Sequence, residues 1–338
     1  MKEQPKFLST SSTLLNLACS GKANGGLPVG SYVLFVGDTN SGKSFFSKAF
    51  LAEASINKAF DGYELILDDV ERADKIDTRK FFGSKLMKRI QPPKKDSKGE
   101  PIYSETVEDL YKNVNEAIKR GPCIYICDSE TGLTCRADIK KAEKDDGKGS
   151  YNLDKPKIHS TKLRQLMTPL EKSGSILIII NQTRDRIGFG AQFDPKTRPG
   201  GRALEFYATV QMWTSIKERI KKQAAGKKRQ VGILSRIRVK RSRVTGKDRT
   251  IDTPIYWSIG IDELGSMVNW LVEEKHWKGT KEADGRVVAP EFKFDGSKED
   301  LIRKIETEGL ERELKAIVVE TWGAIEDACK ILRKSRYE

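Results

Sequence analysis

Four short runs of apolar residues, each about as long as a β-strand, are spaced along the first half of the chain. They are Val33 to Val36 and the segments 63–69, 122–128 and 176–180. Between them apolar residues recur at helical spacing, most clearly in the segment 107–118. Buried strands that alternate with amphipathic helices are typical of α/β proteins. The pattern therefore predicts an α/β fold around a twisted, mostly parallel central sheet.

The pattern changes near both ends of the chain. Residues 1–30 are rich in Ser and Gly and predict a short lead-in that turns into the first strand. From about residue 262, short apolar stripes with capping residues predict three helices and a small hairpin. We therefore expect a lead-in at 1–30, a core domain at 31–261 and a small α+β domain at 262–338.

The loop after the first apolar run has the spacing G-x-x-x-x-G-K-[ST], and aromatic residues follow it at helical spacing. This order of strand, loop and helix is the one that a phosphate-binding loop requires, although the four fixed residues alone arise by chance in roughly 1% of such chains. Its glycines let backbone amides turn inward, and the helix start adds positive potential. Lys43 is expected to reach the β- and γ-phosphates, and the Ser44 hydroxyl to hold Mg²⁺. The expected nucleotide contacts are Gly37, Asp38, Thr39, Asn40, Ser41, Gly42, Lys43, Ser44 and Phe45.

Acidic residues follow two of the other apolar runs. Asp68, Asp69 and Glu71 come at the end of the second run, and Asp128 ends the third. Ligands of α/β proteins bind at the carboxyl ends of parallel strands. Beside a phosphate-binding loop, a carboxylate after the second run is a candidate for orienting the attacking water, and Asp128 is the candidate Walker B residue for Mg²⁺. A solvated loop would show the same acidic cluster, and many strands end in Asp.

Positive charge dominates the chain and is concentrated in one stretch. The formal net charge is +14, and residues 217–249 hold 14 Lys or Arg but only two acids. Such a surplus favours a nucleic-acid partner, because Lys and Arg displace counterions from phosphates; a solvated basic surface is the alternative. Ile233 to Val244 alternates apolar and basic residues, which predicts a strand with one core face and one cationic face. A solvated edge strand would alternate in the same way.

Two hydrophilic stretches are candidates for contact with nucleic acid. Residues 134–157 carry mixed charge and predict a long loop. The stretch after the fourth apolar run combines glycines, arginines and two phenylalanines, which suits contact by charge and by stacking on bases. The candidate DNA contacts in it are Arg184, Arg186, Phe189, Phe193, Lys196, Arg198 and Arg202.

Several classes of protein are disfavoured. The chain has five Cys without a C-x-x-C pair and only two His, so a zinc site is not expected. An odd number of thiols fits the reducing cytoplasm, or the host cytoplasm for a protein encoded by a phage. The N-terminus has no apolar signal region, and the longest aliphatic run, Ile176 to Ile180, is too short for a membrane span. We therefore expect a soluble, cytoplasmic protein with no membrane partner.

The order of these motifs resembles the ATPase core of the RecA-type recombinases. GDTNSGKS stands in the Walker A place, LDDVERAD resembles the strand end that carries the family's catalytic glutamate, and YICDSETGLT resembles the Walker B strand. The most specific match is IIINQTRDRIG with the later GGRALEFYATV, which resembles the strand that leads into the family's second DNA loop. The resemblance covers roughly residues 9–275.

The resemblance implies roles for particular residues. Glu71 matches the catalytic glutamate, Gln182 matches the glutamine that senses the γ-phosphate, and Phe193 falls near the aromatic of the second DNA loop. Arg241 and Arg243 match two cations that reach a neighbouring protomer's nucleotide. The implied activity is that of a DNA-dependent ATPase with ATP and Mg²⁺ as cofactors. It would bind single-stranded DNA, and duplex DNA during strand exchange, in homologous recombination or repair. The implied assembly is a homo-oligomer, either a helical filament or a ring.

The chain also departs from the family pattern. About a dozen residues precede the core, so we expect the N-terminal helix and strand that link family protomers to be missing or reduced. The aromatic expected over adenine falls near Thr78, and a basic end, KILRKSRYE, replaces an acidic tail. Two alternatives remain open: a hexameric helicase motor on the same core, and a nucleotide-regulated DNA-binding accessory protein with little turnover.

Overall fold

The structure is a computed structural model of the whole chain, and it describes residues 7–143, 154–185, 196–280, 285–333 and 336. The chain divides into two compact units. The first holds residues 1–251 and 255–260, and the second holds residues 252–254 and 261–338.

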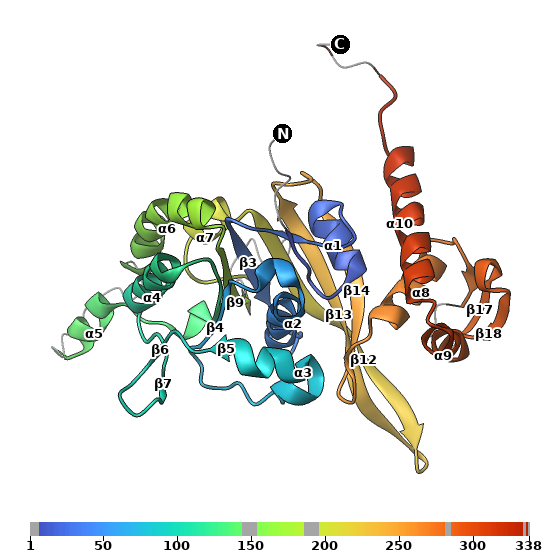
Figure 1. Ribbon diagram of the computed structural model, residues 1–338, viewed down its shortest axis with the longest axis horizontal. Coiled ribbons are helices and arrows are strands. Elements are labelled where there is room, and N and C mark those ends of the chain that lie inside the picture. The colour runs from blue at the N-terminus through green and yellow to red at the C-terminus, as the bar shows by residue number, and fades with distance from the viewer. Residues whose placement is uncertain (1–6, 144–153, 186–195, 281–284, 334–335, 337–338) are drawn as a thin grey trace. The chain divides into compact units, whose positions relative to one another are not determined.

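A nine-stranded sheet forms the centre of the fold (Figure 1). Its strands, in order across the sheet, are β15 (Gly260–Ile261), β14 (Arg249–Tyr256), β13 (Lys227–Ser242), β12 (Val210–Ala224), β3 (Ser31–Gly37), β9 (Ile176–Gln182), β8 (Cys123–Asp128), β4 (Glu64–Asp69) and β5 (Ile90–Gln91). The pairs from β12 through β5 are parallel, whereas β12 and β13 are antiparallel. The four apolar runs are thus four strands of one mostly parallel sheet, as the sequence predicted.

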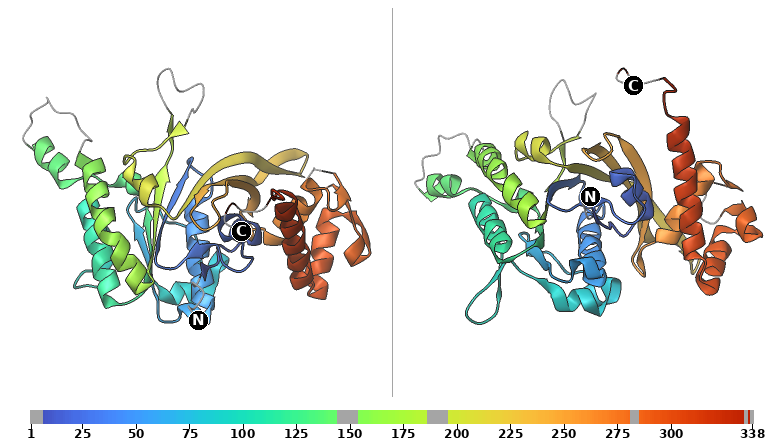
Figure 2. Two further views of the ribbon diagram at one scale, coloured as in Figure 1. Left: turned by 90° about the horizontal axis from the view of Figure 1, so that it is seen from above. Right: turned by 45° about the horizontal axis from the view of Figure 1, so that its top comes forward.

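Helices cover both faces of the parallel part, which is why its strands are apolar without alternation. On one face, β3 presents Tyr32, Leu34 and Val36 to α4 (Val107–Arg120) and α6 (Asp154–Ser173). On the other face, Phe35 packs its ring against the aromatic side chains of α2 (Lys43–Ile56). Figure 2 shows α4 and α6 on the side of the sheet opposite to α2. Because both faces are buried, the carboxyl edge of the sheet is where polar groups gather.

The β12–β13 hairpin extends the sheet into a long basic ribbon. β12 pairs with β13 over its whole length but with β3 only over Val210–Thr214. A bulge at Lys240 interrupts the pairing, because Met212 pairs with Val239 and the preceding Gln211 pairs with Arg241. Before the bulge the odd-numbered residues face the core. After it the order is inverted, so that Ser242 is buried and Arg241 is exposed.

The remaining elements of the first unit are short. Residues 136–143 form a helix and α6 begins at Asp154, so the prediction of a loop throughout 134–157 was wrong in both places; Lys, Ala and Glu, which favour helices, dominate residues 136–143. The other elements are β1 (Phe7–Leu8), α1 (Thr13–Ser20), β2 (Leu27–Pro28), α3 (Thr78–Arg89), β6 (Lys94–Lys95), β7 (Pro101–Ile102), α5 (Arg136–Glu143), β10 (Arg184–Asp185), β11 (Lys196–Thr197) and α7 (Ala203–Tyr207).

The second unit is a small α+β domain, as predicted for the C-terminal region. Its antiparallel sheet has three strands, and three helices pack around a core that includes Trp277, Leu301 and Leu314. Ser297 and Asp300 form the predicted cap of the second helix. The elements are α8 (Glu263–Glu273), β16 (Lys278–Gly279), β17 (Arg286–Ala289), β18 (Phe294–Ser297), α9 (Lys298–Glu308) and α10 (Glu311–Ala328). Among the described residues of either unit, none of the helices combines the length and apolar character that crossing a membrane demands.

Candidate functional site

The loop between β3 and α2 has the tight backbone that phosphate binding requires. Gly42, directly before α2, has φ +99°, a conformation that residues with a side chain rarely adopt. A Cβ on Gly37 would lie 2.6 Å from the carbonyl oxygen of Thr214, so glycine alone fits there. The carbonyl of Ser41 accepts hydrogen bonds from Thr214 Oγ1 at 3.2 Å and Ser235 Oγ at 2.8 Å. The neighbouring strands β12 and β13 therefore hold the loop in shape.

Lys43 is the first residue of α2, directly after this loop, and it is buried. Its Nζ donates to the carbonyls of Gly37 at 2.9 Å and Asp38 at 2.6 Å. Burial lowers the pKa of Lys43, and the nearby negative charge of Asp128 opposes that shift. An ammonium group held by two carbonyls at the mouth of the loop can exchange them for phosphate oxygens.

Asp128 and Ser44 come together at the ends of β8 and of the loop. The pKa of Asp128 is raised to about 6: burial is the main cause and the charge of Glu71 adds to it, while a hydrogen bond from the Ser44 side chain opposes the shift. A hydroxyl and a carboxylate are oxygen donors of the kind that Mg²⁺ prefers. Within the described ranges, His, Cys, Asp and Glu form no cluster of three that could enclose a metal alone. The pair fits a magnesium ion that takes its other ligands from phosphates and water.

The three acids after β4 have different surroundings. Asp68 is fully buried and accepts from Ser104 and Tyr125, so it serves the packing of the sheet edge. Asp69 accepts the backbone N–H groups of the turn that follows, at 3.1–3.2 Å. Glu71 alone meets the ends of two other strands. Its Oε1 accepts from Ser129 Oγ at 2.5 Å and from Gln182 Nε2 at 2.8 Å.

These groups line one cavity of about 770 Å³ in the first unit. Lys43, Ser44, Glu71, Asp128 and Gln182 stand on its polar side. Strands β12, β13 and β14 and the residue after β14 add four apolar side chains to the lining, together with Arg219 and Gln230, and the sequence did not point to them because they come one at a time from separate segments. The four apolar residues, called the apolar wall below, are Ile216, Ile233, Ile255 and Trp257.

The expected DNA contacts are in different positions. Arg186, Phe189 and Phe193 lie outside the described residues. Arg184 lies on β10 and Lys196 on β11, and these two short strands pair with each other. Arg184 and Arg202 are exposed, and Lys196 lies 3.4 Å from Asp38.

Arg198 differs from the other expected contacts. Its side chain is 4% exposed, and it donates to the carbonyls of Pro199 and Gly201 and pairs with Glu205 at 3.1 Å. In this arrangement its guanidinium holds a turn and is not accessible to phosphate.

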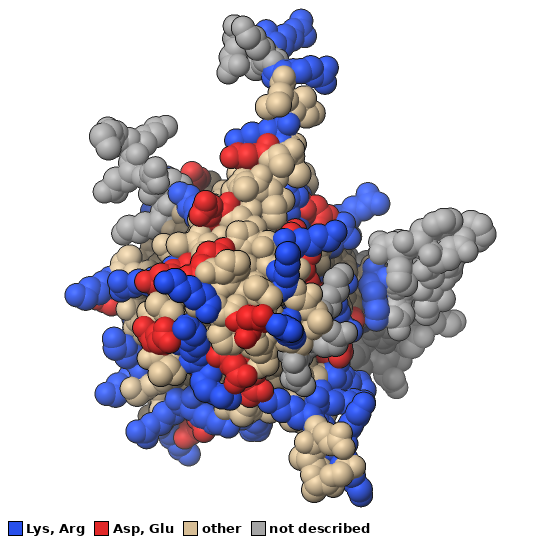
Figure 3. Space-filling model, turned by 90° about the vertical axis from the view of Figure 1, so that its right-hand side faces the viewer, with Lys and Arg blue, Asp and Glu red and all other residues tan. Residues whose placement is uncertain are grey.

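Arg241 and Arg243 lie together next to the end of α7. Arg241 donates to the carbonyl of Glu205 at 3.3 Å, and Arg243 donates to the carbonyls of Phe206 and Ala208. Cations at a helix C-terminus are favourable. Neither arginine lines the cavity that holds Lys43 of its own chain. Lys and Arg are also spread, with acids between them, over the face of the molecule that Figure 3 shows.

A glycine-bounded phosphate-binding loop, placed at the carboxyl edge of a mostly parallel sheet with an antiparallel β12–β13 extension, defines the RecA-like class of P-loop α/β folds. The family model described as the RecA N-terminal domain matches residues 2–262. The chain therefore belongs to the RecA family, a family of recombinases.

Known members are similar over most of the chain. The protein RecA of Lactococcus lactis subsp. cremoris is 28% identical over 275 residues, which cover 80% of this chain and 65% of that protein. The RecA of Thermus thermophilus is 26% identical over 80% of this chain and 73% of its own length. The RecA of Rubrobacter xylanophilus is 30% identical over 79% of this chain and 70% of its own length. This chain thus spans just under two thirds of the Lactococcus protein.

Proposed function

We propose that this protein is an ATP-dependent recombinase that binds single-stranded DNA and hydrolyses ATP faster when DNA is bound. The observation that carries the proposal is the contact of Glu71 with Gln182 beside the phosphate-binding loop. It joins the group that would activate water to a strand that continues into Arg184 and the DNA-contact stretch. Membership of the RecA family supports a role in homologous recombination and DNA repair.

In the proposed mechanism the loop amides and Lys43 bind the phosphates of ATP. Ser44 and Asp128 would hold Mg²⁺, which neutralises charge on the phosphates. Glu71 orients the attacking water and draws its proton, and Gln182 changes its contact with Glu71 when the γ-phosphate is present. The apolar wall with Ile255 and Trp257 would accommodate the base, a position for which Thr78 offers no aromatic ring.

We propose that DNA binds to exposed cations in the Gly- and Arg-rich stretch that follows β9. Arg184, Lys196 and Arg202 are the described candidates, and Arg186, Phe189 and Phe193 complete the set. Arg241 and Arg243 are proposed to act on the nucleotide of the next protomer, as arginine fingers do in other P-loop enzymes. A filament or a ring of protomers would supply that neighbour.

ATP turnover with and without single-stranded DNA tests the proposal directly. We expect DNA to accelerate hydrolysis, DNA affinity to fall steeply with salt because counterions are released, and sequence preference to be weak. Turnover that is negligible under both conditions would favour a nucleotide-regulated accessory protein instead. Negative-stain images with ATP and DNA would distinguish a filament from the ring of a helicase motor.

A further inference from the structure

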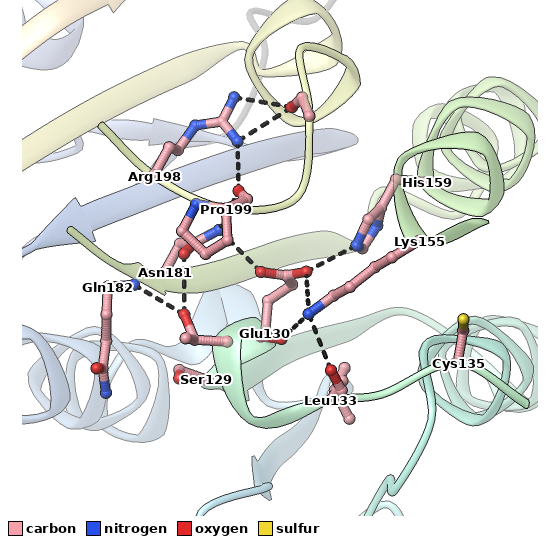
Figure 4. A network of polar contacts seen from close by, with 12 residues as sticks. Ser129, Glu130, Leu133, Cys135, Lys155, His159, Asn181, Gln182, Arg198 and Pro199 are labelled. Carbon is pink, nitrogen blue, oxygen red and sulfur yellow. Dashed lines mark hydrogen bonds and ion pairs between the residues drawn. The ribbon is translucent and has the colours of Figure 1, made fainter. Parts of the chain in front are cut away.

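A buried carboxylate stands one residue beyond Ser129, at the start of the 3₁₀ turn Glu130–Gly132. The Glu130 side chain is fully buried. Figure 4 shows three side chains converging on it. Its Oε1 accepts from Lys155 Nζ at 2.8 Å and from His159 Nε2 at 2.9 Å, and its Oε2 accepts from Asn181 Nδ2 at 2.9 Å. Both oxygens of the buried carboxylate are thus satisfied.

Two of these partners attach the start of α6 to the end of β8. The Lys155 ammonium also donates to the carbonyls of Glu130 and Leu133, each at 2.9 Å, and its side chain is only 10% exposed. His159 is oriented from its other side, because Tyr111 OH lies 2.8 Å from Nδ1. Burying an ammonium is costly unless it has a counter-charge and further acceptors. Glu130 supplies the counter-charge that keeps this end of α6 in place.

The third partner attaches a different segment. Asn181 uses its second amide hydrogen on the carbonyl of Pro199, at 3.2 Å. Gly200 follows with φ +92°, and a Cβ on it would lie 3.2 Å from Glu130 Oε1. Arg198 donates to the carbonyls on both sides of this glycine. The turn before α7 therefore packs against the Glu130 carboxylate.

Asn181 and Gln182 are neighbours on β9 and point to opposite sides of the strand. Gln182 contacts Glu71 in the nucleotide cavity, whereas Asn181 joins the Glu130 cluster. Thr131 links the Asn181 side chain to the backbone of Gln182, because its Oγ1 donates to Asn181 Oδ1 at 2.9 Å and accepts from the backbone N–H of Gln182 at 3.1 Å. One strand end thus carries the nucleotide sensor on one side and the anchored turn on the other.

We propose that Glu130 is a positioning residue that holds the start of α6 and the Pro199–Gly201 turn on the end of β8, and thereby sets the affinity of the chain for single-stranded DNA. This inference rests on the proposed function, in which exposed residues near these anchors contact DNA. Among the described residues, the Glu130 carboxylate bonds to Lys155 and His159 of α6 and to Asn181 of β9, and none of these three lines the nucleotide cavity. Its loss is therefore expected to weaken DNA binding without slowing hydrolysis in the absence of DNA.

Two variants disrupt the ion pair between Glu130 and Lys155 in different ways. Glu130→Gln keeps the size of the side chain but offers a donor where three donors converge, so one hydrogen bond is replaced by a repulsive contact. Lys155→Met keeps the apolar stem and removes the ammonium. For both, the DNA concentration that gives half-maximal stimulation of ATP turnover should rise roughly 3- to 30-fold. The KM for ATP and the turnover without DNA should stay within about twofold of wild type.

Asp68→Asn is the matched control. Asp68 is also a fully buried carboxylate with three hydrogen bonds, but its partners are Ser104 and Tyr125 rather than residues of α6 or β9. Its loss should lower the melting temperature as much as the loss of Glu130 does, yet leave half-saturation by DNA unchanged. If Glu130→Gln and Lys155→Met behave like this control, the positioning role is wrong.

Salt dependence and a double variant distinguish an anchoring lysine from one that contacts DNA. A lysine that touched phosphate would, on removal, reduce the slope of log affinity against log salt by about one. Because Lys155 is buried, the slope should not change, and a reduced slope would overturn its role as an anchor. The double variant Glu130→Gln/Lys155→Met should bind DNA no more weakly than Glu130→Gln alone, since both substitutions remove the same ion pair. Wild-type protein without DNA-stimulated turnover would refute the proposed function itself, whatever the variants do.

Discussion

The side-chain amide of Gln182 donates a hydrogen bond of 2.8 Å to Oε1 of Glu71. Ser129 Oγ donates to the same oxygen, so one edge of the carboxylate is occupied by groups from the ends of β9 and β8. The other oxygen, Oε2, accepts neither of these bonds, so it is the one proposed to orient water. In the proposed mechanism, a γ-phosphate that attracts the amide of Gln182 would release the carboxylate for catalysis and pull on the end of β9.

Glu71→Gln should bind ATP and DNA but hydrolyse ATP at least about 100-fold more slowly, because an amide cannot take a proton from water. Single-turnover hydrolysis and nucleotide binding measured on the same preparation check this. Glu105→Gln is a control, because Glu105 is exposed and pairs with Arg72 near the same loop. Turnover close to wild type in Glu71→Gln would instead indicate Asp69, which also lines the cavity.

Lys43→Met should abolish the stabilisation that nucleotide confers without unfolding the protein. The ammonium of Lys43 is buried in the absence of phosphate, and this burial lowers its pKa, so its removal should not lower the melting temperature of the free protein. Wild type should gain stability with ATP and Mg²⁺ in proportion to the logarithm of ligand concentration. Thermal melts across a nucleotide titration measure both effects. A variant that keeps the shift would show that the loop binds phosphate without its lysine.

Asp128→Asn should have a pH-dependent effect on stability in the absence of Mg²⁺. The folded-state pKa of Asp128 is about 6, raised from 3.8, so the native protein favours the protonated form. The stability that protonated Asp128 contributes to the fold is fully present below pH 3.8 and is lost as the pH rises through 6. At pH 8 the variant should therefore be more stable than wild type by on the order of 3 kcal/mol, and at pH 4 the two should be similar. Urea unfolding at both pH values checks this, and equal stability at pH 8 would contradict it.

The sequence predicted the parallel part of the fold well because burial on both faces leaves uninterrupted apolar runs such as Ile176 to Ile180. It also predicted which acids lie near the loop, because parallel strands end at one edge. The residue pattern alone did not distinguish Asp68 from Glu71, and only the resemblance to the family pointed to Glu71. That difference depends on Ser104 and Tyr125, which are 36 and 57 residues away from Asp68 in the sequence.

Local sequence patterns did not predict the side of β13 on which Arg241 lies, nor the cluster around Glu130. Strict alternation along β13 would place Arg241 on the same side as Ile237 and Val239, which are buried. The bulge at Lys240 reverses this, and it is seen only in the register with β12, where Gln211 pairs with Arg241 and Met212 with Val239. The Glu130 cluster was missed because Lys155, His159 and Asn181 come from segments that only the folded sheet brings together.

Arg241→Ala tests whether the two arginines act on a neighbouring protomer. Both lie beside the end of α7 and away from their own cavity, so an effect on their own nucleotide is not expected. The variant should lose DNA-stimulated hydrolysis but bind ATP normally, with a loss of stability of roughly 0.3–1 kcal/mol from its contact with the helix end. Arg238→Ala is the control, because Arg238 is an exposed arginine on the same strand that pairs with Asp248 within the chain.

Mixing Arg241→Ala with Lys43→Met protein should restore part of the activity, since one protomer supplies the arginine and the other an intact loop. If both variants are folded and assemble with DNA, yet no mixing ratio restores turnover, the arginines act on DNA or within their own subunit.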